Sequence, residues 1–401
     1  MKKRISLITS ALALLLMVSC SEKSDPAYDQ QNFTTILDNN GFSSDNFPLD
    51  FRQTADGGYL ILGETSIENS YFKGVSLTKV DKFGKFESDT TFGEQYVNAI
   101  GDFLQSGDDY YFFCMDAVQQ TAQLVKVTLS GTSLSASINP VNGTTYPAAA
   151  GADGNNFLLL SYDHEDKLMI VSRLNPSGDV IGSPQAFDIG QGENVEEPII
   201  KHFLRTGTRF PFQVGAVSSG LYFFNGFTNY TFSLVFTSLS GGISGVVNGQ
   251  LDDGGFSAVY PLGSSKFAVS RFNFGDNFFL PNAILSTNST SSADNLGGNT
   301  LPELIKNAPV RIIKAQVNSR SMIVYASDTQ SRQIGLFFYD EATGEFISSR
   351  YFGFSNPFEV ANLVQTADGG LAICGTTYLA GRFPRTCVIK VSKEELDKQS
   401  K

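Results

Sequence analysis

Two segments at opposite ends of this 401-residue chain are nearly identical, and this repeat constrains the fold more than any other feature. Residues 53–63 read QTADGGYLILG, and residues 365–375 read QTADGGLAICG. The two copies lie 312 residues apart, which equals six intervals of 52 residues. Recurrence at a period of roughly 20–50 residues is typical of proteins built from similar stacked units. We therefore expect such units throughout the interval.

Weaker copies of the repeat fill the interval between the two segments. Each copy is a short apolar run beside a turn, at residues 108–114, 156–160, 220–224, 266–269 and 321–325. A second pattern recurs at residues 77–81, 124–128 and 171–175, and each of its copies is followed three residues later by a glycine (Gly84, Gly131 and Gly178). Together the two patterns define seven units.

Each unit has the sequence character of short β-strands. Asp-Gly-Gly favours a tight turn because glycine tolerates positive φ, and the apolar runs suit strands that are buried on both faces. Helical periodicity is almost absent outside residues 393–397. With 34 Phe, 15 Tyr and only 17% charged residues, the composition excludes a disordered chain. We predict an all-β protein, a seven-bladed β-propeller of four-stranded blades.

The order of strands along the chain also predicts how the ring closes. The last unit ends after its third strand, at residues 385–392, and residues 32–37 precede the first complete unit. We therefore expect the N-terminal strand to pair with the last blade and close the ring. This reading gives a single domain over residues 32–395 and a C-terminal tail over residues 396–401.

The first twenty residues have the pattern of an export signal. Lys2, Lys3 and Arg4 precede an unbroken run of apolar or small residues that ends at Cys20 and is too short for a membrane-spanning helix. This pattern resembles the signal of bacterial lipoproteins. The resemblance implies a signal peptide at residues 1–19, lipidation of Cys20 with acyl chains such as palmitate, and a lipidated flexible tether at residues 20–31. An ordinary secretory signal with a chance cysteine is the alternative.

The residues after the cysteine indicate a place in the cell envelope. Ser21 rather than aspartate follows Cys20, which fits delivery to the outer membrane, and residues 21–25 (SEKSD) resemble the export tags of Bacteroidetes surface lipoproteins. We expect a lipid-anchored outer-membrane protein, either periplasm-facing or surface-exposed, that contacts the membrane through its anchor only.

The two strongest copies of the repeat resemble a known bacterial secreted repeat with a Gln-Thr-x-Asp-Gly-Gly-Tyr core, called delta-60-like. In that repeat a Lys-x-Asp-x-x-Gly turn and an aromatic-Gly pair follow, and here residues 79–84 and 92–93 match them. Ser88 stands where the family usually has tryptophan. The family is a structural repeat without a fixed activity, so the resemblance implies a β-propeller in an envelope lipoprotein and no particular chemistry.

Net charge and motif content restrict the ligands and the catalytic sites that this protein could have. The formal net charge is −11, which argues against a nucleic-acid partner. The sequence has no nucleophile elbow, P-loop, zincin motif or EF-hand loop. Of its two histidines, His164 lies in an acidic loop, where it is either a metal ligand, a general base or merely solvated, and His202 begins an expected strand. We expect no metal site and no cofactor.

Three cysteines lie within the expected propeller. Cys114 and Cys374 occupy equivalent repeat positions, where the first unit has Leu62, which favours a small buried role. Cys374 and Cys387 flank one hairpin, so they form either a cross-strand disulfide or two buried thiols.

Loops between the second and third strands share one face of a propeller, and in this chain they are rich in aromatic residues and arginine. Such residues are enriched at recognition hot spots. The candidate binding residues in these loops are Tyr71, Phe72, Tyr162, His164, Tyr230, Arg271, Phe274, Tyr378, Arg382 and Phe383. The alternative is that these rings only pack against the ends of the blades.

These observations favour a non-catalytic binding or scaffold module that takes a protein or glycan partner at one propeller face. The alternative function is a polysaccharide hydrolase or lyase with its site in the central funnel. Carboxylates, arginines, tyrosines or histidines converging on the propeller axis would favour the enzyme, whereas a funnel of serine, glycine and aliphatic residues would count against it.

Overall fold

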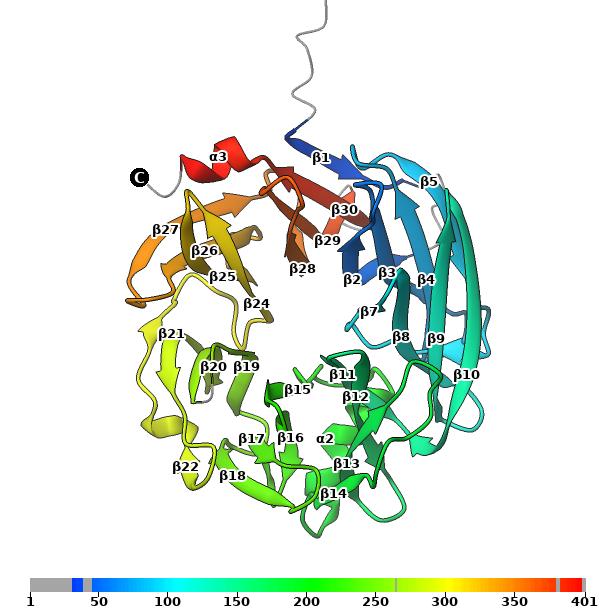
Figure 1. Ribbon diagram of the computed structural model, residues 1–401, viewed down its shortest axis with the longest axis vertical. Helices are drawn as coiled ribbons and strands as arrows, with labels where there is room; N and C mark the ends of the chain where they lie inside the picture. The colour runs from blue at the N-terminus through cyan, green and yellow to red at the C-terminus, as the bar shows by residue number, and fades with distance from the viewer. Residues whose placement is uncertain (1–30, 39–44, 264, 380–382, 399–401) are drawn as a thin grey trace, which may run out of the picture.

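The computed structural model describes residues 31–38, 45–263, 265–379 and 383–398. These residues form an all-β, propeller-like fold in which the sheets lie side by side around a common axis (Figure 1). Most sheets are meanders in which consecutive strands pair antiparallel, as the short connections between apolar runs require. Cys20 and Arg382 lie outside the described residues.

The described strands assemble into six sheets. The first sheet, in spatial order, contains β1 (Phe33–Ile36), β30 (Phe383–Val391), β29 (Leu371–Leu379) and β28 (Phe358–Gln365). The second contains β2 (Asn46–Gln53), β3 (Tyr59–Ser66), β4 (Lys73–Val80), β5 (Phe86–Thr91), β6 (Tyr96–Val97), β7 (Leu104–Ser106), β8 (Asp109–Asp116), β9 (Thr121–Ser130) and β10 (Ser133–Thr145). The third contains β11 (Pro147–Asp153), β12 (Asn156–Asp163), β13 (Leu168–Leu174) and β14 (Gln185–Asp188).

Three further sheets follow along the chain. One contains β15 (Gln213–Ser218), β16 (Leu221–Thr228), β17 (Thr231–Thr237), β18 (Ile243–Asn248) and β22 (Thr290–Ser292), of which β18 and β22 pair in parallel. The next contains β19 (Gly254–Pro261), β20 (Lys266–Asn273), β21 (Asp276–Ile284) and β23 (Asn299–Thr300). The last contains β24 (Val310–Val317), β25 (Arg320–Asp328), β26 (Ile334–Asp340) and β27 (Phe346–Phe352). A 3₁₀ turn, η1 (Ala293–Asn295), follows β22.

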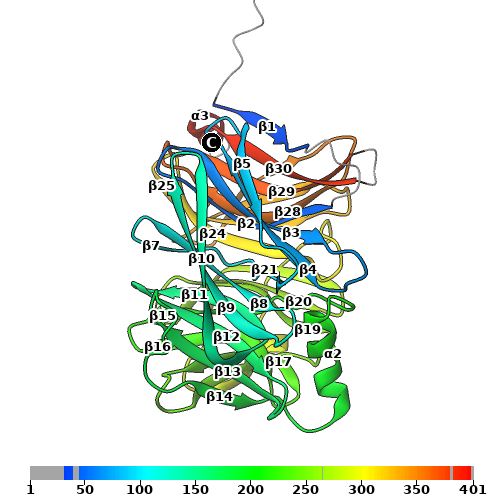
Figure 2. The ribbon, with the colours of Figure 1, turned by 90° about the vertical axis from the view of Figure 1, so that its right-hand side faces the viewer.

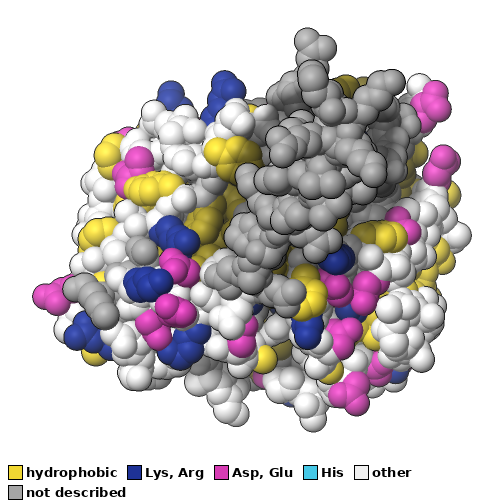
Figure 3. All heavy atoms as spheres, turned by 90° about the horizontal axis from the view of Figure 1, so that it is seen from above, with side chains coloured by type: hydrophobic (Ala, Val, Ile, Leu, Met, Phe, Trp, Pro, Cys, Tyr) yellow, Lys and Arg dark blue, Asp and Glu magenta, His cyan; other side chains and the backbone are white. Residues whose placement is uncertain are grey.

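The N-terminal strand pairs with the end of the chain, as the sequence predicts. β1 runs antiparallel to β30, with Phe33 opposite Lys390 and Ile36 opposite Cys387. Both lie at the edge of the disc that also carries α3 (Lys393–Asp397). Seen from this edge, basic, acidic and hydrophobic side chains lie interspersed on the surface (Figure 3).

Both faces of each sheet are buried against neighbouring sheets. Along β3, Leu60 and Leu62 pack in one hydrophobic cluster, and Tyr59 and Ile61 pack in another on the opposite face. This explains why the strands carry unbroken apolar runs, because alternation is needed only where one face meets water.

Two features at the ends of elements differ from the sequence prediction. Leu396, assigned to a tail, is fully buried in a core cluster, because α3 packs it against the sheets. A second helix, α2 (Glu193–Phe203), occupies a stretch where no helix is expected. Its buried residues Val195, Ile199 and Phe203 recur every four positions, a helical spacing that the β-repeat obscures.

The recurring spacing of the repeat is explained by an ion pair beneath the Asp-Gly-Gly turn, in which the lysine is buried and the aspartate is exposed. Asp56 accepts hydrogen bonds from the Gly58 N–H at 2.9 Å and the Thr54 hydroxyl at 2.5 Å, and Lys79 of β4 pairs with it at 2.9 Å. Burial acts to raise the pKa of Asp56, but these bonds and Lys79 hold it at about 2. The sheet that contains β28, β29 and β30 repeats the pair with Lys390 and Asp368 at 2.8 Å.

Two intermediate units keep the same pairing in weaker form. Lys126 lies 2.7 Å from Asp109, and Arg173 lies 2.6 Å from Asp153. In each case the cation stands on the third strand and the carboxylate at the turn between the first two. The second sequence pattern therefore marks the position of a cation, which the sequence interpretation describes only as a strand and a turn.

Exposure predicts how much each pair contributes. The Lys79 side chain is 0% exposed, whereas that of Lys126 is 39% exposed. Lys79 also pairs with Glu87 at 2.8 Å. We expect Lys79→Met to lower the free energy of unfolding by about 2 kcal/mol, since it leaves the carboxylates of Asp56 and Glu87 without their shared cation, and Lys126→Met to lower it by clearly less. Urea denaturation of both variants measures this, and equal losses would contradict the assignment.

Candidate functional site

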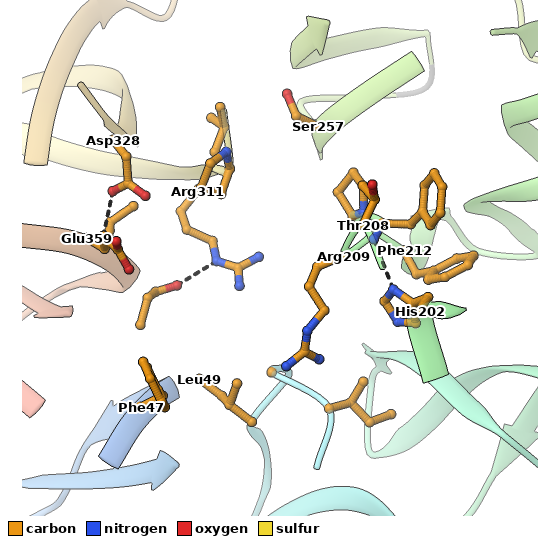
Figure 4. Close-up of a pocket in the computed structure, with 18 of the residues that line it drawn as sticks. Phe47, Leu49, His202, Thr208, Arg209, Phe212, Ser257, Arg311, Asp328 and Glu359 are labelled. Atoms are coloured by element: carbon orange, nitrogen blue, oxygen red, sulfur yellow. Dashed lines mark hydrogen bonds between the residues drawn. The ribbon is translucent and has the colours of Figure 1, made fainter. Parts of the chain in front are cut away.

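A cavity of about 630 Å³ lies where the inner strands approach the axis. Its walls come from β2, β19, β24 and β28 and from the segment that follows α2, so it brings together residues far apart in the chain. Figure 4 shows Arg209 and Arg311 projecting into this space from different sides, with Asp328 and Glu359 together on one wall. α2 stands at one face of the disc (Figure 2).

A buried ion cluster fixes the segment after α2 onto β3. Glu64 accepts from Arg205 at 3.2 Å and from Arg209 at 2.9 Å. The side chains of Glu64 and Arg205 are only 4% and 8% exposed, whereas Arg209 is 45% exposed. Burial lowers the pKa of Arg205 to about 10, and Glu64 opposes this change, so the guanidinium stays charged at neutral pH. Arg209 is thereby anchored at one nitrogen while its remainder faces the cavity.

His202 lines the cavity but is a packing residue. It lies on α2, not at the start of a strand as the sequence interpretation has it. Its Nδ1 accepts the Phe210 N–H at 2.9 Å, and its ring meets Phe203 and Phe212 edge-on. Burial, with Arg205 and Arg209 nearby, lowers its pKa well below the usual value. The neutral ring with an occupied Nδ1 is therefore not available there as a general base.

Arg311 approaches the cavity from β24. Its Nε donates to the Ala361 carbonyl oxygen at 2.7 Å, which fixes the guanidinium plane. Within the described ranges, no protein acceptor is recorded for its two terminal nitrogens. Arg311 thus presents preorganised N–H donors to the cavity.

Two carboxyl groups stand on the wall beside Arg311. Asp328 accepts the Val360 N–H at 2.7 Å, and Glu359 accepts the Tyr378 hydroxyl at 2.9 Å. Burial, with the Glu359 charge, raises the pKa of Asp328 to about 7, although the Val360 hydrogen bond and Arg311 act in the opposite direction. A smaller cavity of about 300 Å³ shares these two carboxyl groups and is also lined by Tyr378 and Arg332.

A further carboxyl on the cavity wall links two sheets. Asp102 accepts the Ala150 N–H at 2.9 Å, and burial raises its pKa to about 6. Similar polar links join other neighbours, such as Gln213 to the Val259 N–H at 2.8 Å. These half-buried carboxyl and amide groups link adjacent sheets near the axis.

The raised pKa of Asp328 predicts a pH dependence of stability. A carboxyl whose pKa is higher in the folded state favours folding below its unfolded value, and this contribution is lost as pH rises towards 7. Asp328→Asn keeps the acceptor for Val360. We expect the variant to match wild type near pH 4 and to be about 2–4 kcal/mol more stable at pH 8. Urea unfolding at both pH values tests this. Equal stability of wild type and Asp328→Asn at pH 8 would contradict the prediction.

The structure distributes the sequence-predicted loop residues over several environments. Tyr71, Tyr230 and Phe274 are exposed at the connections after β3, β16 and β20. Phe72 and Phe383 are half-buried and line neither cavity described here. Their role in binding stays a prediction, and Arg382 lies outside the described residues.

Three of the predicted residues serve packing or positioning. The Arg271 guanidinium is buried over the Phe278 ring at 4.0 Å and donates to the Gly297 carbonyl at 3.2 Å. Tyr162 is buried, and its hydroxyl donates to Glu196 at 2.6 Å. His164 contacts the same carboxylate at 2.6 Å, so this pair ties α2 to the third sheet. For Arg271 and Tyr162, packing at blade ends is the better interpretation. Among the predicted residues that the structure describes, Tyr378 lines the smaller of the two cavities.

Of the two alternatives for Cys374 and Cys387, the structure contains the two buried thiols. Cys374 and Cys387 are both free and buried. Cys374 stands opposite Val388, and Cys387 stands opposite Gly375. The two side chains belong to hydrophobic clusters on opposite faces of the sheet. Burial raises the pKa of the Cys387 thiol to about 12, which keeps it protonated. Cys114 is also buried and free, as its repeat position predicts.

Comparisons with known proteins identify fold likeness only. No protein-family model and no curated protein matches the chain. Raptor of Chaetomium thermophilum matches with a TM-score of 0.49 and 9% identity, over 88% of this chain and 29% of its own. Prolyl oligopeptidase B of Galerina marginata gives 0.46 and 11%, over 90% of this chain and 52% of its own. The Dos1 propeller gives 0.44 and 8%, over 90% and 94%.

This chain therefore spans about half the length of that oligopeptidase and less than a third of Raptor. At such identities and scores, the likeness bears on neither ligand nor activity. Among the described residues, no helix is long and apolar enough to cross a membrane, and no group of three or more His, Cys, Asp or Glu side chains is placed to hold a metal ion.

Proposed function

We propose that this protein is an outer-membrane lipoprotein whose β-propeller is a non-catalytic binding module, with a protein or glycan partner entering the axial cavity. The observation that carries the proposal is the cavity itself. Its volume of about 630 Å³ lies in the range of ligand pockets. Its walls present the anchored donors of Arg209 and Arg311, and the acceptors of Asp328 and Glu359 lie on the wall beside Arg311. A rigid scaffold with fixed polar groups loses little entropy on binding.

The proposal includes a ring of seven blades closed by β1. The nine-stranded sheet contains two four-stranded meanders, β2 to β5 and β7 to β10, joined only through the two-residue strand β6. Counting each meander as one blade gives seven units, in agreement with the sequence repeat. The pairing of β1 with β30 supplies a fourth strand to the last blade.

Anchoring through Cys20 is the second element of the proposal. The resemblance to lipoprotein signals and to the delta-60-like repeat supports it, and β1, the first described strand, lies at the edge of the disc. In cells, Cys20→Ser is expected to abolish fatty-acid labelling and to move the protein from the membrane to the soluble fraction. A labelled, membrane-bound variant would refute the anchor. Protease treatment of intact cells then distinguishes surface exposure from a periplasm-facing position.

The binding role is tested by blocking the cavity. Thr208 is exposed and lines the cavity, so Thr208→Trp fills it without entering the core. The full-length lipidated protein, cross-linked in native membranes, should capture an envelope component that the blocked variant loses. Thr132→Trp, in the exposed turn between β9 and β10, is the matched control. Equal capture by both variants would refute binding at this cavity.

A polysaccharide hydrolase or lyase is the second candidate, and one observation favours it. Asp328, Glu359, Arg311 and Arg209 do converge at the axis, and a carboxyl with a pKa of about 7 suits a general acid. Incubation with acidic and neutral polysaccharides, followed by assays for new reducing ends and unsaturated products, tests this. Product formed by wild type and abolished in Asp328→Asn would establish the enzyme in place of the binding module.

A further inference from the structure

The two arginines of the cavity, Arg209 and Arg311, hold open hydrogen-bond donors for a ligand. Each is fixed at one nitrogen, Arg209 by Glu64 at 2.9 Å and Arg311 by the Ala361 carbonyl at 2.7 Å. A guanidinium carries five N–H donors, so most donors of both groups remain available to the cavity. Figure 4 shows the two side chains projecting into the same space from different elements. Anchored guanidinium groups lose little freedom when they bind, so their open donors are suited to an anion.

The carboxyl groups of Asp328 and Glu359, on the wall beside Arg311, limit which class of anionic ligand fits the cavity. Asp328 uses one oxygen for the Val360 N–H, and Glu359 uses one for the Tyr378 hydroxyl. Each carboxyl group retains a second oxygen for which no partner is recorded among the described residues. Carboxylate oxygens accept hydrogen bonds from hydroxyl groups, but they repel further negative charges. The ligand therefore needs hydroxyl groups at this wall and its charge at the arginines.

An acidic peptide does not meet this requirement. It would carry carboxylates at several positions and few hydroxyl groups, so it would place like charges near Asp328 and Glu359. A saccharide has hydroxyl groups on every ring and an anionic group only where a uronate or sulfate stands. Phe47 and Phe212 also line the cavity and offer apolar surface to the C–H face of a sugar ring.

From this arrangement we infer that the cavity binds an acidic saccharide, with its carboxylate or sulfate between Arg209 and Arg311 and its hydroxyl groups on Asp328 and Glu359. The inference rests on the proposed binding function and names the ligand class. It applies equally to a bound chain end and to a segment within a chain, because the cavity is defined by its donors and acceptors.

Matched oligosaccharides test the inference on the full-length protein in detergent. Calorimetry compares tetragalacturonate, its methyl ester, a sulfated oligosaccharide of similar size and tetraglutamate. The methyl ester keeps most hydroxyl groups but removes the charge, and tetraglutamate keeps carboxylates without the sugar. We expect binding of the uronate, the sulfated sugar or both, which distinguishes the two sources of the anion. Binding of the methyl ester with equal affinity, or of tetraglutamate alone, would overturn the inference.

Charge-removing variants place the site. Arg209→Gln and Arg311→Gln should each weaken binding of the acidic oligosaccharide by about 10- to 100-fold, the loss of a charge-assisted contact. Arg320→Gln makes the same charge change at an exposed position at the start of β25 and should leave the affinity unchanged. Thermal unfolding of each variant confirms that it is folded. Unchanged affinity in both cavity variants would exclude this site.

The two proposals fail in different ways. If Thr208→Trp loses an envelope partner that wild type captures, but wild type binds none of the acidic oligosaccharides, the ligand class is wrong and the binding function stands. If Thr208→Trp captures the same components as wild type, the binding function at this cavity is wrong as well.

Discussion

Gly370→Ala is expected to lower the free energy of unfolding by about 3 kcal/mol, a large loss for one methyl group. Gly370 ends the Asp-Gly-Gly turn between β28 and β29, where its N–H donates to Asp368 at 3.0 Å. A Cβ built there would lie under 3.0 Å from both the Val391 carbonyl oxygen and the Lys390 ammonium group. The carbonyl belongs to a strand backbone and cannot turn aside. The turn must therefore open, and the buried Lys390 then loses its carboxylate partner.

Two further glycine variants make this prediction specific. Gly58 occupies the same place in the first unit, and its Cβ would meet Val80 and Lys79 in the same way, so Gly58→Ala should cost a similar amount. Gly263 has open space around its Cβ position and no left-handed φ, so Gly263→Ala should change stability by less than about 0.5 kcal/mol. Chemical denaturation measures all three. Small losses for both turn variants would show that the turn tolerates a side chain.

Glu64→Leu is expected to destabilise the protein by about 3–5 kcal/mol, because it leaves the guanidinium of Arg205 buried without a carboxylate. Arg205 is 8% exposed, and its Nε already has no hydrogen-bond partner. Arg209 loses its anchor in the same variant, so binding at the cavity should weaken as well. The effect on stability comes mainly from Arg205, since Arg209 can turn towards water.

A double-mutant cycle separates the buried pair from its surroundings. Arg205→Met alone leaves Glu64 paired with Arg209, so a smaller loss is expected than for Glu64→Leu. The combined Glu64→Leu and Arg205→Met variant should be more stable than the sum of the single losses predicts, with a coupling of about 1–3 kcal/mol. Additive losses in urea denaturation would show that the two side chains act independently.

The sequence predicted the parts of this fold that local chemistry controls. The repeat predicts the Asp-Gly-Gly turns and the apolar strands that are buried on both faces. It also predicts the pairing of the N-terminal strand β1 with β30 near the end of the chain. The short helix at residues 393–397 is also confirmed. Helix α2 was missed because the β-repeat dominated the interpretation, although Val195, Ile199 and Phe203 have helical spacing.

The candidate site was mostly beyond sequence reasoning. Aromatic residues and arginine in the loops drew attention to Tyr162 and Arg271, yet the structure buries both in packing roles. Glu64 and Asp328 carry a weak signal, since each is a charged residue that ends an apolar strand, where burial demands a partner. The partners themselves lie far away in the chain, so that signal could not be interpreted.

What the sequence determined by itself is the repeating unit, because a turn, a strand and the cation beneath the turn are set by residues within one unit. Only the tertiary structure decided which side chains meet at the axis. Arg209 and Arg311 are 102 residues apart in sequence, and they share a cavity because α2 and β24 are brought to the same axis. The periodicity of the repeat does not predict that these two side chains line the same cavity, because neither arginine occupies a recurring position of the repeat.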